Sequence, residues 1–287
     1  MFPAIGLILL LVLVFGGFAL SGGALGPVFA AMPLEMLIIG GAAVASLVTG
    51  NSPHHLKALA GGFARIFKGP RYSADDHVAA IAVVGKLMRV LKTEGPVALE
   101  AHVMEPENSA IFAEFPGILK SHEVTALICD TLTLLVVSSG SLETHAIEDI
   151  MDNAIKSHLH EMEEPAHAIQ MLADALPALG IVAAVLGIVK TMGSIDQPPE
   201  VLGKMIGSAL VGTFLGVLLA YGIVSPLAGR LKQINSEDAQ IFNSVKQVLI
   251  ASLHGYPHAL AVEAARSGLP HSIRPPLIQL LDDLKGR

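Results

Sequence analysis

The sequence predicts an all-α polytopic membrane protein with four transmembrane helices, arranged as two hairpins, and a large helical cytoplasmic insertion. Of the 287 residues, 52% are hydrophobic and only 15% are charged, a composition typical of membrane proteins. Two apolar stretches, Ala173–Met192 and Val201–Gly229, are each long enough to cross a bilayer, which takes about 20 residues. Two further apolar runs near the N-terminus, Ile5–Leu20 and Leu34–Thr49, complete the set.

Composition also argues against several function classes. The formal net charge of −7 disfavours a nucleic-acid partner, which would require a clustered basic face. The single cysteine, Cys129, excludes an internal disulfide and a zinc site built from several cysteines. A histidine cluster (His158, His160, His167) lies among acidic residues but matches no known metal-ligand motif, and no P-loop, dinucleotide fingerprint or nucleophile elbow is present. We therefore expect neither an enzyme nor a bound cofactor or metal.

The first hairpin is expected within residues 1–50. Its first span is Ile5–Leu20, which we expect to be retained, because a secretory signal would need a basic segment before the apolar run. A turn of small residues leads to the second span, Leu34–Thr49. This span is short, so Glu35 is expected at its entrance, where a charge can reach water at little cost.

Basic residues predict the orientation. The turn between the first two spans contains no Lys or Arg, and only Lys190 and Lys204 border the turn between the last two. Cytoplasmic loops collect Lys and Arg, so we expect both turns outside and both termini in the cytoplasm. The basic residues that follow the second and fourth spans are Lys57, Arg65, Lys68, Arg71, Arg230 and Lys232.

Residues 51–172 are expected to form a helical cytoplasmic domain. Ala74–Thr93 has apolar residues at helical spacing, and Ser109–Phe115 and Ser121–Ser139 should form further helices. The last of these is apolar enough to resemble a fifth span. Asp130 and three threonines within it favour a buried helix of a soluble domain instead.

The polar, acidic segment His145–Glu164 is predicted to be a solvated helix that leads back to the membrane. Residues 230–287 are expected to form a cytoplasmic tail, which begins as a helix and loosens around Gly255.

The second hairpin, residues 173–229, has almost no charge in its interior. Within its two spans, Ala173–Met192 and Val201–Gly229, only Asp174, near the start of the third span, is acidic, and no charged residue lies between Met205 and Gly229. A transporter or channel usually places ionisable groups inside the membrane. If an ion crosses at this hairpin, the exchangeable carboxylate is therefore expected from another chain.

Two prolines and a hydroxyl interrupt this hairpin. Pro177 and Pro226 lie near the expected cytoplasmic ends and would each remove a backbone hydrogen bond and bend a helix, although ordinary membrane-helix prolines do the same. Thr213, in mid-span, either bonds its own preceding turn or lines a pathway. Small residues recur every four or five positions, a spacing that lets helix backbones approach closely: Gly203, Gly207, Gly212 and Gly216.

Two segments of the hairpin carry a family resemblance. Residues 175–187 (ALPALGIVAAVLG) and 211–228 (VGTFLGVLLAYGIVSPLA) resemble the MotA family of flagellar motor stator proteins. The likeness extends to residues 14–17 (VFGG), 105–107 (EPE) and 255–256 (GY), so it covers essentially the whole chain.

This resemblance implies a four-helix subunit of the bacterial inner membrane. In the family, five copies form a ring in the lipid bilayer around two helices of MotB, which supplies a membrane aspartate. Ion passage past that aspartate is thought to rotate the ring, whose cytoplasmic part drives the rotor protein FliG.

The resemblance also implies roles for individual residues. By motif, Pro177 and Pro226 are the two functional prolines, Thr213 faces the ion path, and Tyr221 lies on the same helix. Ala184 occupies a site where sodium-driven relatives carry threonine, which implies coupling to protons.

The charges that would contact the rotor match less closely. In a comparison without gaps, Glu100 matches the acidic residue that the family uses for rotor contact, and Lys92 matches the arginine that the family uses there. Lysine keeps the charge but lacks the planar fork that grips a carboxylate, and Arg89, one turn earlier, is a candidate to share the role. The alternative is that all three only solvate the helix surface.

Three other interpretations remain open from sequence alone. An ExbB- or TolQ-like subunit would have three spans, so the second N-terminal span counts against it. A secondary transporter would place polar groups at the membrane midplane of this chain. A purely structural scaffold would leave Thr213 and the prolines without a role.

Overall fold

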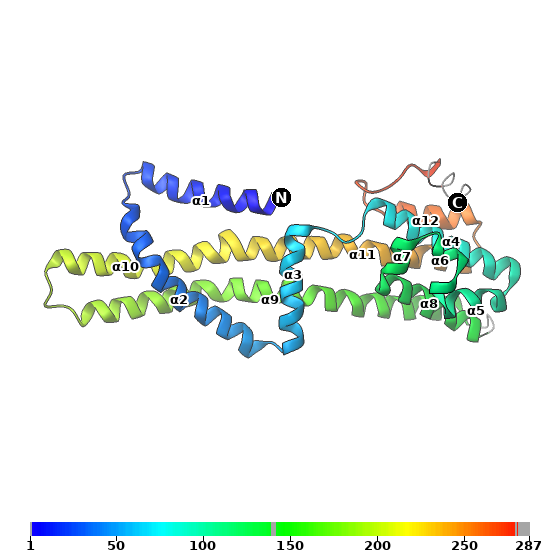
Figure 1. Ribbon diagram of the computed structural model, residues 1–287, viewed down its shortest axis with the longest axis horizontal. Coiled ribbons are helices and arrows are strands. Elements are labelled where there is room, and N and C mark those ends of the chain that lie inside the picture. The colour runs from blue at the N-terminus through cyan, green and yellow to red at the C-terminus, as the bar shows by residue number, and fades with distance from the viewer. Residues whose placement is uncertain (1, 139–141, 279, 281–287) are drawn as a thin grey trace. The chain divides into compact units, whose positions relative to one another are not determined.

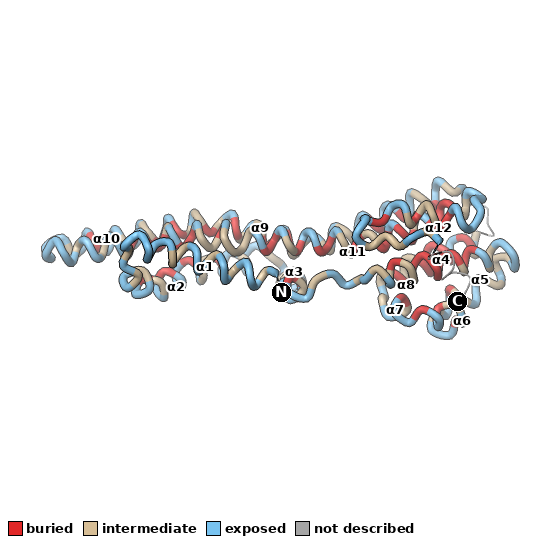
Figure 2. The backbone as a smooth tube through the Cα atoms, turned by 90° about the horizontal axis from the view of Figure 1, so that it is seen from above, coloured by how far each residue is buried: buried red, intermediate tan, exposed pale blue. Residues whose placement is uncertain are grey.

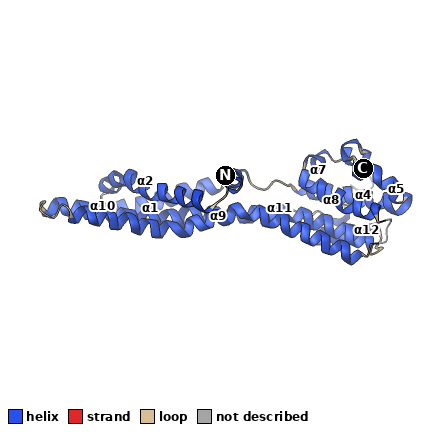
Figure 3. Cartoon of the chain, turned by 90° about the horizontal axis from the view of Figure 1, so that it is seen from below, coloured by secondary structure: helices blue, strands red, loops and turns tan. Residues whose placement is uncertain are grey.

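The computed structural model describes residues 2–138, 142–278 and 280. Throughout these residues the regular structure is helical, as Figure 3 shows. Four helical segments of the described chain are long and apolar enough to cross a membrane (Phe2–Leu20, Leu25–Gly50, Thr144–Met192 and Pro199–Leu253). The predicted fold class, an all-α protein with four spanning helices, is confirmed.

The helices follow one another with short connections (Figure 1). In chain order they are α1 (Phe2–Leu20), α2 (Leu25–Gly50), α3 (Pro53–Lys68), α4 (Ala74–Glu94), α5 (Pro96–Met104), η1 (Pro106–Asn108), α6 (Ala110–Ala113), α7 (Pro116–Lys120), α8 (His122–Val137), α9 (Thr144–Met192), α10 (Pro199–Val217), η2 (Leu218–Val224), α11 (Ser225–Leu253) and α12 (His258–Ser267).

The chain divides into two compact units. Unit 1 comprises Met1–Gly69 with Met162–Ile234, and unit 2 comprises Pro70–Glu161 with Asn235–Arg287. These boundaries differ from the four segments expected from sequence, because α9 and α11 each continue without a break from one unit into the other. Compact units and membrane segments are different divisions of a chain, so the four-segment organisation stays a prediction.

In unit 1, the second spanning helix is longer than expected. Helix α2 has 26 residues and begins at Leu25, whereas hydropathy placed its start at Leu34. Pro27 lies in its first turn, where a backbone N–H has no helical partner and proline is tolerated. Pro33 lies within the helix. Apolar runs identify spans, but a helix can begin well before the run does.

The longer helix changes the position of Glu35. The sequence placed this residue at the entrance of the span, but it lies ten residues into α2 and its side chain is buried, with 7% of the residue exposed. Its carboxyl lies beside Gly212 of α10. At a rise of 1.5 Å per residue, Gly212 is about 20 Å along α10 from the first residue of that helix. The expectation that Glu35 lies at the entrance of the span is therefore wrong.

Helices α9 and α10 run side by side and meet almost backbone to backbone (Figure 1). A Cβ atom added to Gly216 would lie 2.7 Å from the carbonyl oxygen of Leu176 and 2.9 Å from the Cα of Gly180. A Cβ added to Gly180 would lie 2.8 Å from the carbonyl oxygen of Gly212. Contact this close requires residues without side chains.

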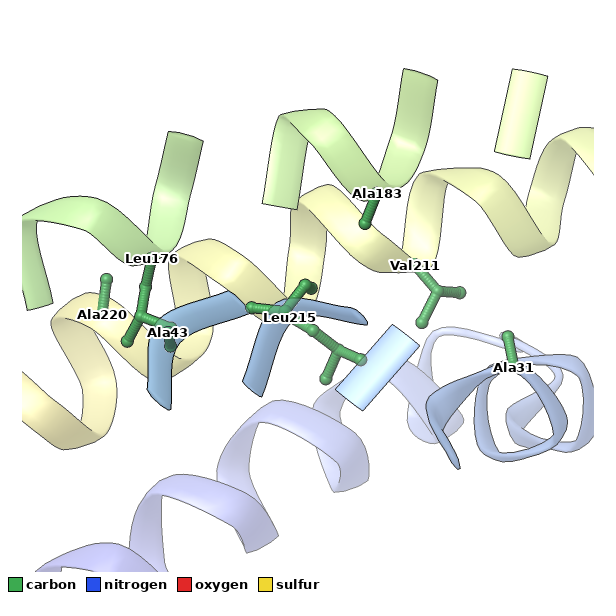
Figure 4. Close-up of a cluster of buried hydrophobic side chains, with 8 residues drawn as sticks. Ala31, Ala43, Leu176, Ala183, Val211, Leu215 and Ala220 are labelled. Atoms are coloured by element: carbon green, nitrogen blue, oxygen red, sulfur yellow. The ribbon is translucent and has the colours of Figure 1, made fainter. Parts of the chain in front are cut away.

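A small apolar cluster surrounds this contact. Side chains from α2, α9, α10 and η2 pack together in it, and half of the buried ones are alanines (Figure 4). Outside this cluster, much of the surface of the spanning helices is exposed, and α1 has no buried residue at all (Figure 2). The buried members are Ala31, Ile39, Ala43, Leu176, Ala183, Val211, Leu215 and Ala220.

The four glycines of α10 divide into two pairs. Gly212 and Gly216 face α9 closely, whereas a Cβ at Gly203 or Gly207 would meet nothing within 4 Å. The predicted close approach of helix backbones is therefore confirmed for the inner pair only.

Unit 2 is built around α4 and α8. The predicted helix Ala74–Thr93 is observed as α4, with a capping box formed by Ser73 and Asp76 at its start. Helix α8 has 16 residues, and Val124, Ile128 and Leu132 on it are fully buried in the unit. The prediction that this apolar segment is a buried helix of a folded domain, and not a fifth span, is confirmed.

The polar segment before the third span is helical, as predicted, but it is not solvated on all sides. It forms the first part of the 49-residue helix α9, and Ile147 and Met151 on it are fully buried. After α11, the chain turns at Gly255, which has a φ of +81°, a conformation suited to glycine.

The α9–α10 contact yields a prediction about stability. Replacing Gly216 with alanine should lower the free energy of unfolding by about 1–3 kcal/mol, because a methyl group there forces two backbones apart. The matched change Gly207→Ala enters open space and should alter it by at most about 1 kcal/mol, in the stabilising direction. Thermal unfolding midpoints of the two detergent-solubilised variants test this, and equal midpoints would contradict it.

Candidate functional site

The second spanning hairpin contains an irregular helical segment that the sequence did not predict. Residues Leu218–Val224 form a π-helix, and the backbone N–H of Ser225 donates to the carbonyl of Ala220, five residues earlier. The next residue, Pro226, has no N–H to donate. Single turns of π-helix are rare and occur often at functional sites. The signal in the sequence is the proline itself, which predicts a bend but not the wider turn before it.

Two of the predicted ion-path residues lie at the same level of the hairpin. The backbone nitrogen of Ala184 would be 3.3 Å from a Cβ on Gly212, the residue that precedes Thr213. Both Ala184 and Thr213 are partly buried. The packing of α9 on α10 therefore brings these two positions, 29 residues apart in sequence, to one region of the hairpin.

The hydroxyl group of Thr213 is unusual among the threonines of the spanning helices. Thr49 and Thr191 each donate a hydrogen bond, of 2.9 Å, to the carbonyl four residues earlier. Within the described residues, Thr213 makes no such bond. Of the two alternatives left open by the sequence, the geometry favours a hydroxyl that is available to a group outside this helix.

The remaining predicted residues lie away from that level. Pro177 is partly buried in α9, while Pro226 is exposed and Tyr221, in the π-helix, is 64% exposed. The five positions therefore do not form a closed site within one chain. They lie along a hairpin with exposed surface, an arrangement that suits a site completed by other chains.

In unit 2, two of the three predicted rotor-facing charges share a groove. Arg89 and Lys92, both exposed on α4, line a groove of about 340 Å³ together with Tyr256 and His258. Burial and the nearby charge of Arg89 lower the pKa of His258. Gly85 leaves space for this histidine, because a Cβ there would lie 2.7 Å from its ring.

Glu100 does not line this groove. It is exposed on α5, which follows α4 after the turn at Gly95. Among the described residues, none of Arg89, Lys92 and Glu100 takes part in an ion pair. They are charges that a second protein can reach.

Other charged residues of unit 2 hold the unit together. The Arg71 guanidinium donates a hydrogen bond to the carboxylate of Glu123 at 2.9 Å. Burial of Glu123 raises its pKa, but hydrogen bonds to the carboxylate and the charge of Arg71 outweigh this effect, so the pKa of Glu123 is lowered. Lys246 bridges Glu148 at 3.2 Å and Asp152 at 2.7 Å. These paired groups differ from the unpaired charges on α4 and α5.

The histidine cluster forms no metal site in the described residues, where no group of three or more His, Cys, Asp or Glu side chains has the required arrangement. His158 stacks edge-on against Phe242, with ring centroids 4.6 Å apart. Burial lowers its pKa, which favours the neutral ring in this contact.

Two family models match the chain. A model described as motility protein A N-terminal matches residues 4–95, and a model of the MotA/TolQ/ExbB proton channel family matches residues 123–244. The second match includes the hairpin of α9 and α10, where Ala184 and Thr213 lie.

Solved structures with the same fold include two stator complexes. The structure of C. jejuni MotAB has a TM-score of 0.71 at 18% identity and covers 96% of this chain and 97% of that chain. The flagellar MotAB stator complex from Bacillus subtilis has a TM-score of 0.68 at 22% identity and covers 98% of both chains. At these identities the likeness establishes the fold.

Relatives of known name are more similar in sequence. The chain is 38% identical over 281 residues to motility protein A of Salmonella typhimurium, covering 98% of this chain and 94% of that protein. Motility protein A of Escherichia coli gives the same identity and coverage. Chemotaxis protein LafT of Vibrio parahaemolyticus is 33% identical over 96% of this chain and 95% of its own. The chain therefore belongs to the motility protein A family, within the MotA/TolQ/ExbB proton channel family.

Proposed function

We propose that this chain is the ring-forming subunit of a flagellar stator, which couples inward proton flow across the bacterial inner membrane to torque on the rotor. It is a motor subunit and not an enzyme. The observation that carries the proposal is the second hairpin. Helices α9 and α10 pack backbone to backbone and present an unbonded Thr213 hydroxyl at mid-span, and a π-helical turn ends just before Pro226. Membership of the family supports it.

A partner subunit of the MotB type completes the ion path in this proposal. The solved relatives are MotAB complexes. In this chain, the membrane-spanning parts of α9 and α10 have acidic residues only near their ends, Asp174 and Glu200, and Asp196 lies in the turn between the two helices. Helices α9 and α10 supply no carboxylate of their own at the level of Thr213, and besides Glu35, which reaches this level from α2, one must come from another chain. The partner's membrane aspartate fills that role.

The transported ion is the proton. Ala184 lies at the level of Thr213 and adds no oxygen ligand there. A sodium ion that loses its water needs several oxygen ligands, whereas a proton needs only one acceptor. The apolar side chain at this position therefore supports proton coupling.

The assembly and orientation follow from the same reasoning. The chain forms a ring of five copies embedded in lipid, with both termini and unit 2 in the cytoplasm. The unpaired charges Arg89, Lys92 and Glu100 then face the rotor protein FliG, and their exposure supports this role. An ExbB- or TolQ-like role is not favoured, because the motility protein A N-terminal model matches both helices of the first hairpin.

Loss of either proline should stop the motor. Pro177→Leu or Pro226→Leu restores a backbone N–H at a position where proline weakens the helix, so each variant should insert in the membrane at wild-type levels and yet abolish swimming. Soft-agar spreading with immunoblots of the membrane fraction measures both. Pro198→Leu, in the exposed outer turn, is the matched control and should swim. Normal motility in both the Pro177→Leu and the Pro226→Leu variant would count decisively against the stator assignment.

Reversing the unpaired charges should uncouple the stator from the rotor. The combined change Lys92→Glu and Glu100→Lys should stop rotation of tethered cells while flagella still assemble, because both contacts with the rotor become repulsive. Lys156→Glu, an exposed lysine of α9 in the same unit, controls for the added negative charge. Wild-type rotation speed in the double variant would refute a rotor-facing role for these residues.

A further inference from the structure

Glu35 on α2 is a buried carboxyl without a hydrogen-bond donor. The residue is 7% exposed, and its Oε2 atom is buried and forms no hydrogen bond with any described residue. An ionised carboxylate in such a place costs several kcal/mol unless it is paired or neutralised. The ionised form of this carboxyl is therefore disfavoured unless water or a group from another chain pairs with it.

The backbone of α10 leaves room for this carboxyl. A Cβ on Gly212 would lie 2.6 Å from Oε2 of Glu35, so the glycine accommodates the acid at this point. Gly212 directly precedes Thr213, and its other neighbours are Ala183 and the backbone nitrogen of Ala184. The carboxyl of α2 thus lies beside the level of the hairpin at which the proposed ion path is expected.

A cavity of about 500 Å³ connects Glu35 with the outer part of the hairpin. Residues of α2, α9 and α10 line it, and most of them are apolar. Its titratable groups are Glu35, Lys190 and Lys204, and α1, which packs beside α2, has no titratable side chain. Lys204 pairs with Glu200 at 3.1 Å, and Lys190 and Lys204 lie toward the outer ends of their helices. Glu35 is the one acid among the lining residues of this cavity.

The chemistry of this cavity selects a proton over a metal cation. Its side-chain oxygen groups are one carboxyl and the hydroxyls of Thr191 and Ser208. Hard metal cations take about six or more oxygen ligands, which is more than these three side chains supply. A hydronium ion needs only one acceptor, to which it transfers its proton.

We propose that Glu35 is a second proton-binding group of the motor, a relay carboxyl that receives protons from the outer side before they reach the acid of the partner subunit. The carboxylate takes a proton from hydronium and releases water, and the carboxylic acid later returns the proton to a water molecule on the path. This inference rests on the proposed stator function and adds to it a residue of this chain.

The test uses the complete motor. A strain without its own copy of this chain is complemented with wild type, Glu35→Gln, Glu35→Asp or the control Asp196→Asn, which removes an exposed acid of the outer turn. Bead rotation at low load reports ion flux, and a fluorescent fusion counts the stators in each motor. Glu35→Gln should enter the motor in wild-type numbers yet rotate at low load about a hundredfold more slowly, the lower end of the loss expected for a missing proton-transfer group. Glu35→Asp and Asp196→Asn should rotate near the wild-type speed.

The possible outcomes separate the two proposals. Wild-type low-load speed in Glu35→Gln would overturn the relay, and so would failure of this isosteric variant to enter the motor, because the carboxyl would then serve packing alone. Failure of the stator assignment would show in the wild-type chain itself, which would then restore no rotation.

A chemical probe gives a readout that is independent of rotation. Dicyclohexylcarbodiimide modifies carboxyls that are protonated and lie in apolar surroundings. In the purified full-length complex it should label Glu35, detected by mass spectrometry of the peptide, and more strongly at low pH than at high pH. Absence of label at every pH would also overturn the proposal.

Discussion

The close contact of α9 with α10 is the constraint on which the spanning unit depends. Gly180, Gly212 and Gly216 bring the two backbones together without intervening side chains. In a bilayer, where apolar side chains gain little by leaving lipid, such close packing is a main source of helix association. The contact fixes the relative height of the two helices, and therefore which residues of one lie level with which residues of the other.

The polar groups of the hairpin take their positions from this contact. Thr213 follows directly after a contact glycine, and Glu35 of α2 occupies the space that Gly212 leaves open. The π-helical turn at Leu218–Val224 and the missing N–H of Pro226 lie beyond the contact, toward α11. A tightly packed segment next to a π-helical turn, where the regular hydrogen-bond pattern changes, is suited to convert a local change in charge into a change in helix direction.

Much of this fold follows from the pattern of residues. Apolar length gave the four spans, helical spacing gave α4, and Asp130 with its neighbouring threonines separated α8 from the spans. The family motifs located the hairpin. These features could be predicted because each depends on a run of residues and on local propensity.

Other features could not be read from the sequence, because they depend on packing. Hydropathy does not report that α2 begins at Leu25, nor that its tilt carries Glu35 to the level of Gly212. Spacing alone cannot tell Gly212 and Gly216, which face α9, from Gly203 and Gly207, which face open space. The absence of acids on α9 and α10 pointed to a partner, and this reasoning overlooked an acid that reaches these helices from α2.

The central claim is that the hairpin of this chain conducts protons only when a partner subunit supplies an acid at its mid-span. Proton uptake by lipid vesicles that enclose a pH-sensitive dye tests this most directly, with the purified chain alone and with the chain co-purified with its partner. The chain alone should conduct no more than protein-free vesicles, and the complex should conduct measurably. Full conduction by the chain alone would contradict the claim.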